Sequence, residues 1–361
     1  MIAYDGWDRE YHENREVYIE IFDQFMKQTN YENNEEFERN FATYIGRKYC
    51  VSVASATDAL HFSLLAHNIG PGDEVLVTDF SWISSASCVN MVGATAVFCD
   101  IDLDTYQMSF ESIKRMYSSK TKAIVYVHLF GGMTDTTEIE QFCKDKKIAF
   151  IEDAAQSLGS RYNARCAGTI GDCSVFSFNS NKVIAGINGG GVILTDDSNM
   201  AKHLQMIRRH GKDKTFDLLG YNSRMYVFNA QIINLRLQNI KRYQEKRQSI
   251  AKCYNLAFKN LPIITPKVPQ SLDHNFHKYT LRFENKDTRN RVKNALNASV
   301  HYEIPLSENG MYNVKNHKKD DCPNSKLVAD TILSLPIHPW LTDKEVNIII
   351  EKVKTSTWQY L

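Results

Sequence analysis

Short apolar runs alternate with longer amphipathic stretches along most of the chain. The apolar runs have the length and composition of buried strands, and they fall at 49–53, 74–77, 96–100, 123–127, 148–151, 173–178 and 192–194. Apolar residues at helical spacing between these runs predict helices at 54–66, 84–92, 138–146 and 200–209. Strands that alternate with helices predict an α/β fold with a mostly parallel sheet flanked by helices.

The two ends of the chain follow other patterns. Both are expected to contain helices, at 14–42, 229–256, 289–298 and 342–354, and a strand is expected near 277–283. The last helix is preceded by Thr342 and Glu345 at the spacing of a capping box. From residue 259 onward the segments are shorter and richer in proline. We therefore predict a large domain over 1–245 and a smaller C-terminal α+β domain over 246–361.

Two polar residues that could take part in catalysis follow predicted strands. Asp153 comes at the end of the apolar run 148–151, and Lys182 follows the run 173–178 and precedes a glycine cluster at 186–191. Ligands of open α/β sheets bind at such strand ends. A lysine that bonds to an aldehyde, opposite a carboxylate that pairs with a pyridinium nitrogen, is typical of pyridoxal phosphate (PLP) enzymes. Either residue alone is better interpreted as an ordinary surface charge, and the pairing favours a PLP site.

Three motifs carry a resemblance to a known family: EDAAQSLG, GTIGDCSVFSFNSNK and GGGVILTDD. They resemble the sugar aminotransferases of the DegT/DnrJ/StrS family, within the fold-type I PLP-dependent enzymes, and the similarity extends over nearly the whole chain. The resemblance implies PLP as cofactor, L-glutamate as amino donor and a keto-deoxysugar linked to dTDP, UDP or GDP as acceptor. The product would be an amino sugar, for example for surface polysaccharide biosynthesis.

The resemblance also implies roles for single residues around the cofactor. Lys182 would bond to PLP and later move a proton, and Asp153 would keep the ring nitrogen protonated. Gln156 would hydrogen-bond the 3′-oxygen of the ring, and Ser177 would bind the phosphate. Trp82 would stack on the pyridine ring, although a core aromatic beneath a helix is the alternative. One branch of the family has histidine in place of the lysine and catalyses dehydration, so Lys182 favours transamination.

Two further segments are assigned through the same resemblance. Ala56 and Thr57 begin a predicted helix whose first N–H groups suit a phosphate. Relatives usually have glycine in place of Ala56, and alanine fits only where the backbone is not left-handed. The segment GYNSRM resembles a motif whose asparagine, here Asn222, reaches the cofactor phosphate of a partner subunit. A homodimer is therefore expected, with Arg224 assigned only to bracing this loop.

Some positions depart from the family pattern or carry no assignment. Ser307 replaces a histidine that recognises sugar in relatives, so that role is not transferred to it. Asn188 replaces an acid that often precedes the glycine pair, and no physical reason for the change is evident. His128 follows a strand and could face the cofactor, but a structural role is the better interpretation.

Composition narrows the remaining classes of function. The formal net charge is +1, so no basic surface for nucleic acid is predicted. We find neither an apolar run of about 18 residues, which would predict a membrane span, nor a signal peptide at the acidic N-terminus. The eight cysteines are scattered without a CxxC pair, which predicts free thiols in the cytoplasm and no metal site.

Two alternative functions on the same fold stay open. One is a PLP-dependent lyase, which needs other contacts to its substrate and is disfavoured by the GYNSRM segment. The other is a PLP-binding regulatory protein. Such proteins usually add a DNA-binding region, and no basic helix-turn-helix segment is visible in the sequence.

Overall fold

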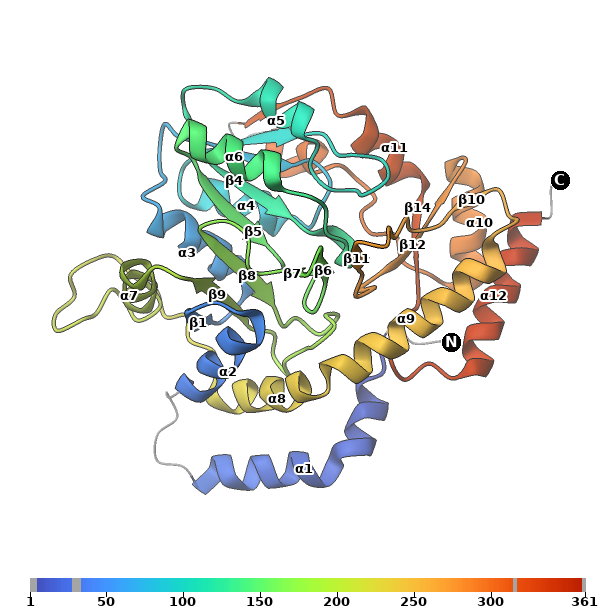
Figure 1. Ribbon diagram of the computed structural model, residues 1–361, viewed down its shortest axis with the longest axis horizontal. Helices are drawn as coiled ribbons and strands as arrows, with labels where there is room; N and C mark the ends of the chain where they lie inside the picture. The colour runs from blue at the N-terminus through green and yellow to red at the C-terminus, as the bar shows by residue number, and fades with distance from the viewer. Residues whose placement is uncertain (1–4, 28–33, 314–316, 359–361) are drawn as a thin grey trace.

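The computed structural model describes residues 5–27, 34–313 and 317–358. Within them, the central feature is an eight-stranded sheet (Figure 1). In spatial order its strands are β1 (Tyr49–Val53), β9 (Gly191–Thr195), β8 (Cys173–Ser177), β5 (Ala149–Asp153), β4 (Thr121–Val127), β2 (Glu74–Thr78), β3 (Thr95–Cys99) and β13 (His317–Lys319). Strand β9 runs antiparallel to β1 and β8, and the other neighbouring pairs are parallel. The predicted α/β class and mostly parallel sheet are confirmed.

Helices cover both faces of this sheet, which explains the continuous apolar runs in its strands. One face packs against α2 (Glu35–Ile45), α5 (Phe110–Met116), α6 (Thr137–Lys146) and α8 (Val227–Gln238). The other packs against α3 (Ala56–Ala66), α4 (Ser84–Met91) and α7 (Ser198–Ile207). In β2, Leu76 belongs to the first core and Val75 and Val77 to the second. Successive strand residues point to opposite faces, so both sets must be apolar.

The C-terminal part of the chain builds a separate core beside the sheet. This part of the chain contains the antiparallel strands β10 (Ile263–Ile264), β12 (Tyr279–Phe283) and β14 (Ile332–Leu335), with α10 (Lys286–Leu296), α11 (Pro323–Thr331) and α12 (Asp343–Trp358). Figure 1 shows α9 (Ile240–Phe258) running from beneath the large sheet to this part, while α1 (Trp7–Lys27) lies along α8. The predicted capping box is present, because Glu345 N donates to Thr342 Oγ1 at 3.2 Å and Thr342 N to Glu345 Oε2 at 2.9 Å.

Short elements complete the described chain. A third sheet consists of β6 (Arg161–Tyr162), β7 (Arg165–Cys166) and β11 (Leu272–Asp273). Single 3-10 turns form at η1 (Leu129–Gly131), η2 (Leu306–Glu308) and η3 (Gly310–Asn313). As shown below, the segments before β12 and η2 bring side chains of the C-terminal part to the edge of the large sheet.

The structure differs from the sequence-based expectations in several elements. The long helix expected at 229–256 is two helices, because Asn239 leaves the helical conformation with φ −98° and ψ 1° between α8 and α9. The expected helical stretch 14–42 contains α1 and α2, and its residues 28–33 lie outside the described part. Strand β13 was not predicted, since its sequence His-Lys-Lys carries no apolar signal. The expected domain boundary at 245–246 falls inside α9, and the division itself stays a prediction.

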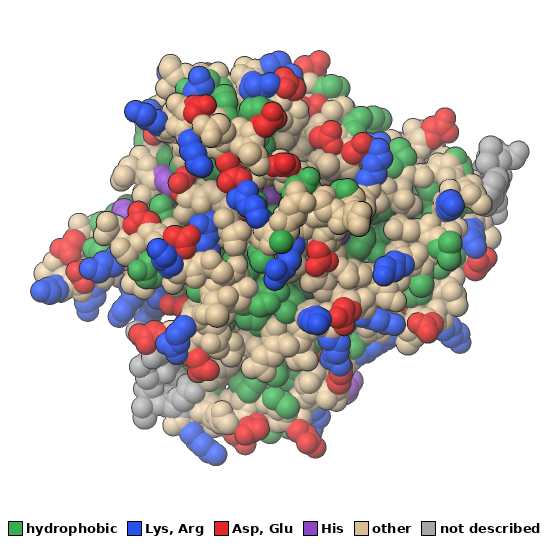
Figure 2. Space-filling view, in the orientation of Figure 1, with side chains coloured by type: hydrophobic (Ala, Val, Ile, Leu, Met, Phe, Trp, Pro, Cys, Tyr) green, Lys and Arg blue, Asp and Glu red, His purple; other side chains and the backbone are tan. Residues whose placement is uncertain are grey.

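The surface carries charges of both signs. On the face shown in Figure 2, lysine and arginine side chains are interspersed with aspartate and glutamate. None of the helices in the described part of the chain has the length and apolar character that crossing a lipid bilayer requires.

Gly191 is predicted to be essential for the packing of β9 against the start of α3. A Cβ there would lie 2.6 Å from Ala56 N and from the carbonyl carbon and oxygen of Ser55. Because backbone cannot yield as a side chain can, Gly191→Ala should lower the free energy of unfolding by about 1–3 kcal/mol. Gly70→Ala is the matched control, since the nearest atom there is Val92 O at 3.8 Å. Equal denaturant midpoints for the two variants would contradict the packing argument.

Candidate active site

A cavity of about 390 Å³ lies at the edge of the large sheet where the parallel strands end. Its lining comes from the segments after β1, β2, β5 and β8 and from the segment before β9, which runs the other way. Seven residues assigned from the sequence line it together: Ala56, Thr57, Trp82, Asp153, Gln156, Ser177 and Lys182. The expectation that polar residues at strand ends share one ligand site is therefore matched by their placement.

Lys182 and Asp153 have the most strongly perturbed environment among these residues. Lys182 follows β8 and is half-buried, and burial of its amine lowers the pKa to about 8, with the charge of Asp153 opposing the shift. Asp153 is the last residue of β5, and burial raises the pKa of its carboxyl group. Hydrogen bonds from Ala155 N and Ser85 Oγ, both at 3.1 Å, and the charge of Lys182 act against that rise. Burial disfavours both charged forms, while their mutual attraction favours them.

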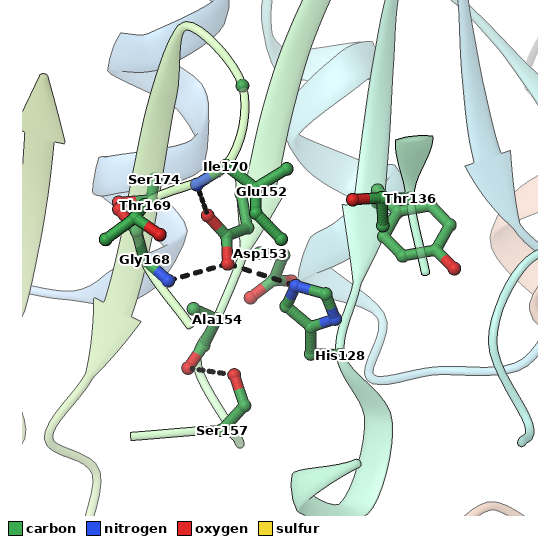
Figure 3. Close-up of polar contacts among 12 residues, drawn as sticks. His128, Thr136, Glu152, Asp153, Ala154, Ser157, Gly168, Thr169, Ile170 and Ser174 are labelled. Atoms are coloured by element: carbon green, nitrogen blue, oxygen red, sulfur yellow. Dashed lines mark hydrogen bonds and ion pairs between the residues drawn. The ribbon is translucent and has the colours of Figure 1, made fainter. Parts of the chain in front are cut away.

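Glu152, at the end of β5, holds the neighbouring loop and His128 through polar contacts (Figure 3). Its carboxylate accepts hydrogen bonds from Gly168 N at 2.6 Å and Ile170 N at 2.8 Å, and it lies 3.0 Å from His128 Nε2. His128 N also donates to the backbone oxygen of Asp153 at 3.1 Å. His128 is fully buried and is not part of the cavity lining, so its role is structural. These bonds fix the strand end that carries Asp153.

The N-terminus of α3 forms another wall of the cavity. Ser55 caps the helix by accepting a hydrogen bond from Asp58 N at 3.1 Å. Ala56 is the first helical residue and does not have a positive φ, so the alanine in place of the family's glycine causes no backbone strain. Thr57 Oγ1 is 2.8 Å from Ser84 Oγ. A helix start with free N–H groups and a positive dipole end suits an anion such as phosphate.

Gln156 and Trp82 line the cavity next to Tyr302. The amide of Gln156 is held at both ends, since its oxygen accepts from Phe130 N at 2.9 Å and its nitrogen donates to the Tyr302 hydroxyl at 3.0 Å. Trp82 is 60% exposed, with its ring centroid 6.3 Å from that of Tyr302. Its exposure excludes the alternative of a core aromatic.

The C-terminal part contributes four cavity residues that the sequence pattern does not predict. These are His277, Lys278, His301 and Tyr302. Neither of the two segments that carry these residues follows a strand of the large sheet, so the rule that ligands bind at strand ends does not identify them. Only the packing of the C-terminal part against the sheet brings them to the cavity.

Asn222, Ser307 and Asn188 differ in their positions relative to the cavity. Asn222 is exposed and is not among the residues that line the cavity of its own chain. Ser307 is buried outside the cavity, where its backbone N donates to Asp79 Oδ1 at 2.7 Å. Asn188 does line the cavity.

Comparison with known proteins identifies the family. The profile of the DegT/DnrJ/EryC1/StrS aminotransferase family matches residues 11–354. The chain belongs to this family. It is 34% identical to UDP-N-acetyl-3-dehydro-α-D-glucosamine 3-aminotransferase of Acidithiobacillus ferrooxidans, with 88% of this chain and 86% of that protein covered. It is 30% identical to a protein of Geobacillus stearothermophilus named as a pleiotropic regulatory protein, with 95% of each chain covered.

Solved structures agree with this family assignment. A sugar aminotransferase of Streptococcus pneumoniae in its PLP form superposes with a TM-score of 0.89 at 26% identity, covering 95% of this chain and 96% of that one. The same enzyme is known in a pyridoxamine phosphate (PMP) form. The chain described here is therefore a PLP-dependent aminotransferase. Its cavity fits this cofactor, because an amine, a buried carboxylate and a helix N-terminus surround one space.

Capture of PLP by the apoprotein should follow the titration of Lys182. Only the neutral amine attacks an aldehyde, so the capture rate should rise with pH through about 8 instead of near the ordinary lysine value of 10.5. Asp153→Asn removes the charge that favours the ammonium form, so the midpoint should move to lower pH. Stopped-flow absorbance after mixing apoprotein with PLP measures both. A midpoint above pH 10 in wild type, or an upward shift in the variant, would contradict this electrostatic account.

Proposed function

We propose that the protein transfers an amino group from L-glutamate to a nucleotide-linked keto-deoxysugar and so makes an amino sugar for polysaccharide biosynthesis. The observation that carries the proposal is the placement of the Lys182 amine and the Asp153 carboxylate at one cavity beside a helix N-terminus. The relative from A. ferrooxidans, whose name gives a UDP-linked keto sugar as substrate, supports the acceptor class. The free state of all eight cysteines supports a reducing, cytoplasmic location.

Two residues of this chain carry the chemistry in the proposal. When bound, PLP supplies an aldehyde for covalent attachment and a ring that accepts the electrons of the reacting carbon. Lys182 holds the cofactor and, once freed by the donor, moves a proton at its Nζ. A pKa of about 8 leaves a useful fraction of this amine neutral near physiological pH. Asp153 holds a proton at the ring nitrogen through its carboxylate.

The other lining residues bind and orient the cofactor in this proposal. Ala56 and Thr57 offer the N–H groups of α3 to the phosphate, and Ser177 adds a hydroxyl at the end of β8. The Gln156 amide faces the 3′-oxygen from its fixed position between Phe130 and Tyr302. Trp82 covers one face of the ring and limits access of water from the open side.

An absorbance experiment separates this function from the alternatives. Purified protein loaded with PLP should be yellow, and L-glutamate should bleach the band and release 2-oxoglutarate. Lys182→Gln should show no such band and should lose at least about a thousandfold in turnover, because it removes both the attachment point and the proton carrier.

The control in this experiment is a melting curve of Lys182→Gln, which should match that of wild type. A yellow protein that is indifferent to glutamate would favour a lyase or the regulatory function named for the G. stearothermophilus relative. Undiminished turnover in the variant would exclude the proposed role of Lys182.

We also propose that the active unit is a homodimer in which Asn222 completes the site of the other subunit. Asn222 is exposed, and it lies in a segment that follows the projecting loop after α7 (Figure 1). Large apolar side chains are exposed in this region and near the cavity, among them Trp82, Ile187, Phe216, Leu219 and Tyr226. Apolar surface of this kind is typical of protein interfaces.

Mixing two inactive variants tests the exchange across the interface. Asn222→Ala lacks the partner-directed group, whereas Lys182→Ala retains it but cannot hold PLP covalently. A mixed dimer has one complete site, so random pairing of equal amounts should restore about a quarter of wild-type activity. Activity that stays at the level of the separate variants, after subunit exchange has been verified by sedimentation, would contradict a role for Asn222 in trans.

A further inference from the structure

Lys278 is a buried lysine that the reaction outlined above does not use. It directly precedes β12 and is 8% exposed, and its backbone N donates to Phe130 O at 3.2 Å. Its side chain lines the active-site cavity together with Lys182. It also lines a second cavity of about 180 Å³, whose lining includes Phe130, Tyr106 and Leu129. Lys278 therefore stands between the two spaces.

No residue in the described part of the chain neutralises this amine. It has no hydrogen-bond acceptor and no ion-pair partner there, and the only acid that acts on it, Asp5, does so through distant charge alone. Burial and the charges of Arg247 and Lys182 together lower the pKa of Lys278 to about 7. A buried cation without a counter-ion is costly unless a ligand supplies one.

The charged and titratable side chains that line the active-site cavity have an uneven balance of sign. Asp153 is the one carboxylate among the described lining residues, against two lysines, Lys182 and Lys278. Burial lowers the pKa of His277 and of His301, so these two imidazoles stay neutral. Asp153 is assigned to the ring nitrogen, and Lys182 is assigned to the attachment of the cofactor. Lys278 then remains as the cationic side chain without a partner.

The cofactor phosphate is not positioned to provide the missing charge. Its proposed seat, the start of α3 and the end of β8, lies toward the β1 edge of the sheet. Lys278 instead contacts the segment after β4, which is separated from β1 by β9, β8 and β5. The counter-ion must therefore come from the substrate side of the cofactor.

A second hydrogen-bond donor, the Tyr302 hydroxyl, lines the same cavity as Lys278. The Tyr302 hydroxyl accepts from Gln156 Nε2, and its own hydrogen is not used by a bond within the described residues. Phe130 contacts both Tyr302 and Lys278. Its ring stacks on the Tyr302 ring with a centroid distance of 6.3 Å, and its backbone oxygen accepts a hydrogen bond from Lys278 N. An ammonium and a hydroxyl on one wall match the two oxygens of a carboxylate.

We propose that Lys278 binds a carboxylate group of the substrate in the active-site cavity, with Tyr302 as second donor. This assignment rests on the proposed aminotransferase function and adds the chemistry by which the enzyme selects its substrate. The carboxylate comes either from the amino donor or from an acidic sugar that accepts the amine.

The test compares Lys278→Met with wild type in each half of the reaction. Met keeps the length and apolar stem of lysine but lacks its charge. The donor arm titrates L-glutamate against PLP-loaded protein and follows the loss of the yellow band. The acceptor arm uses PMP-loaded protein and two UDP-linked keto sugars, one with a carboxylate at C6 and one with a hydroxymethyl group. Lys267→Met is the matched control, since Lys267 borders only the second cavity and pairs with Asp104 at 2.6 Å on the surface.

Loss of one charged hydrogen bond should weaken apparent affinity by about 10- to 100-fold in the arm that carries the carboxylate. Weakening in the donor arm assigns the site to glutamate, and weakening only for the C6 acid assigns it to the sugar. Lys278→Arg should recover part of the loss, and Lys267→Met should change neither arm. Unchanged constants in both arms for Lys278→Met overturn the carboxylate site while the aminotransferase function stands. A wild-type protein that reacts with no substrate contradicts the proposed function and this inference together.

Discussion

The electrostatic relation between Lys182 and Asp153 depends on their burial at one cavity. Burial lowers the pKa of the amine and raises that of the carboxyl group, and the attraction between the two charges opposes both shifts. Transamination requires an amine whose pKa lies near physiological pH and an acid that can share a proton. The parallel pairing of β5 with β8, which sets Asp153 opposite Val175, fixes where the two strands end relative to each other.

The surrounding structure keeps these strand ends in place. Glu152 accepts hydrogen bonds from two backbone N–H groups of the loop 168–170 and lies within hydrogen-bond distance of the His128 imidazole. These contacts join β4, β5 and this loop in one hydrogen-bonded unit. Glu152 and His128 are fully buried, and an unpaired polar group in the interior would cost about 1–3 kcal/mol. The close approach of Gly191 to Ser55 and Ala56 positions the start of α3 at the same edge. The scaffold thus places groups from separate strands around one cofactor-sized space.

The sequence allowed the large sheet and the centre of the site to be predicted, for identifiable reasons. Buried parallel strands require continuous apolar runs, so β2, β4 and β8 stand out, and Lys182 and Asp153 follow from the rule that ligands bind at strand ends. Gln156 and Ser177 were assigned only through family resemblance. Lys278 and Tyr302 could not be placed, because their approach to the cavity depends on long-range packing. Strand β13 and the break at Asn239 were missed because a polar edge strand and a single non-helical residue leave no periodic signal.

The central claim is that, of the lysines around the cavity, Lys182 is the one that bonds to PLP. Reduction of the PLP-loaded protein with borohydride makes that bond permanent, and peptide mass spectrometry then locates the modified lysine. The account predicts stoichiometric modification of the peptide that contains Lys182. Modification of Lys278 in place of Lys182, or scattered labelling of surface lysines, would contradict it.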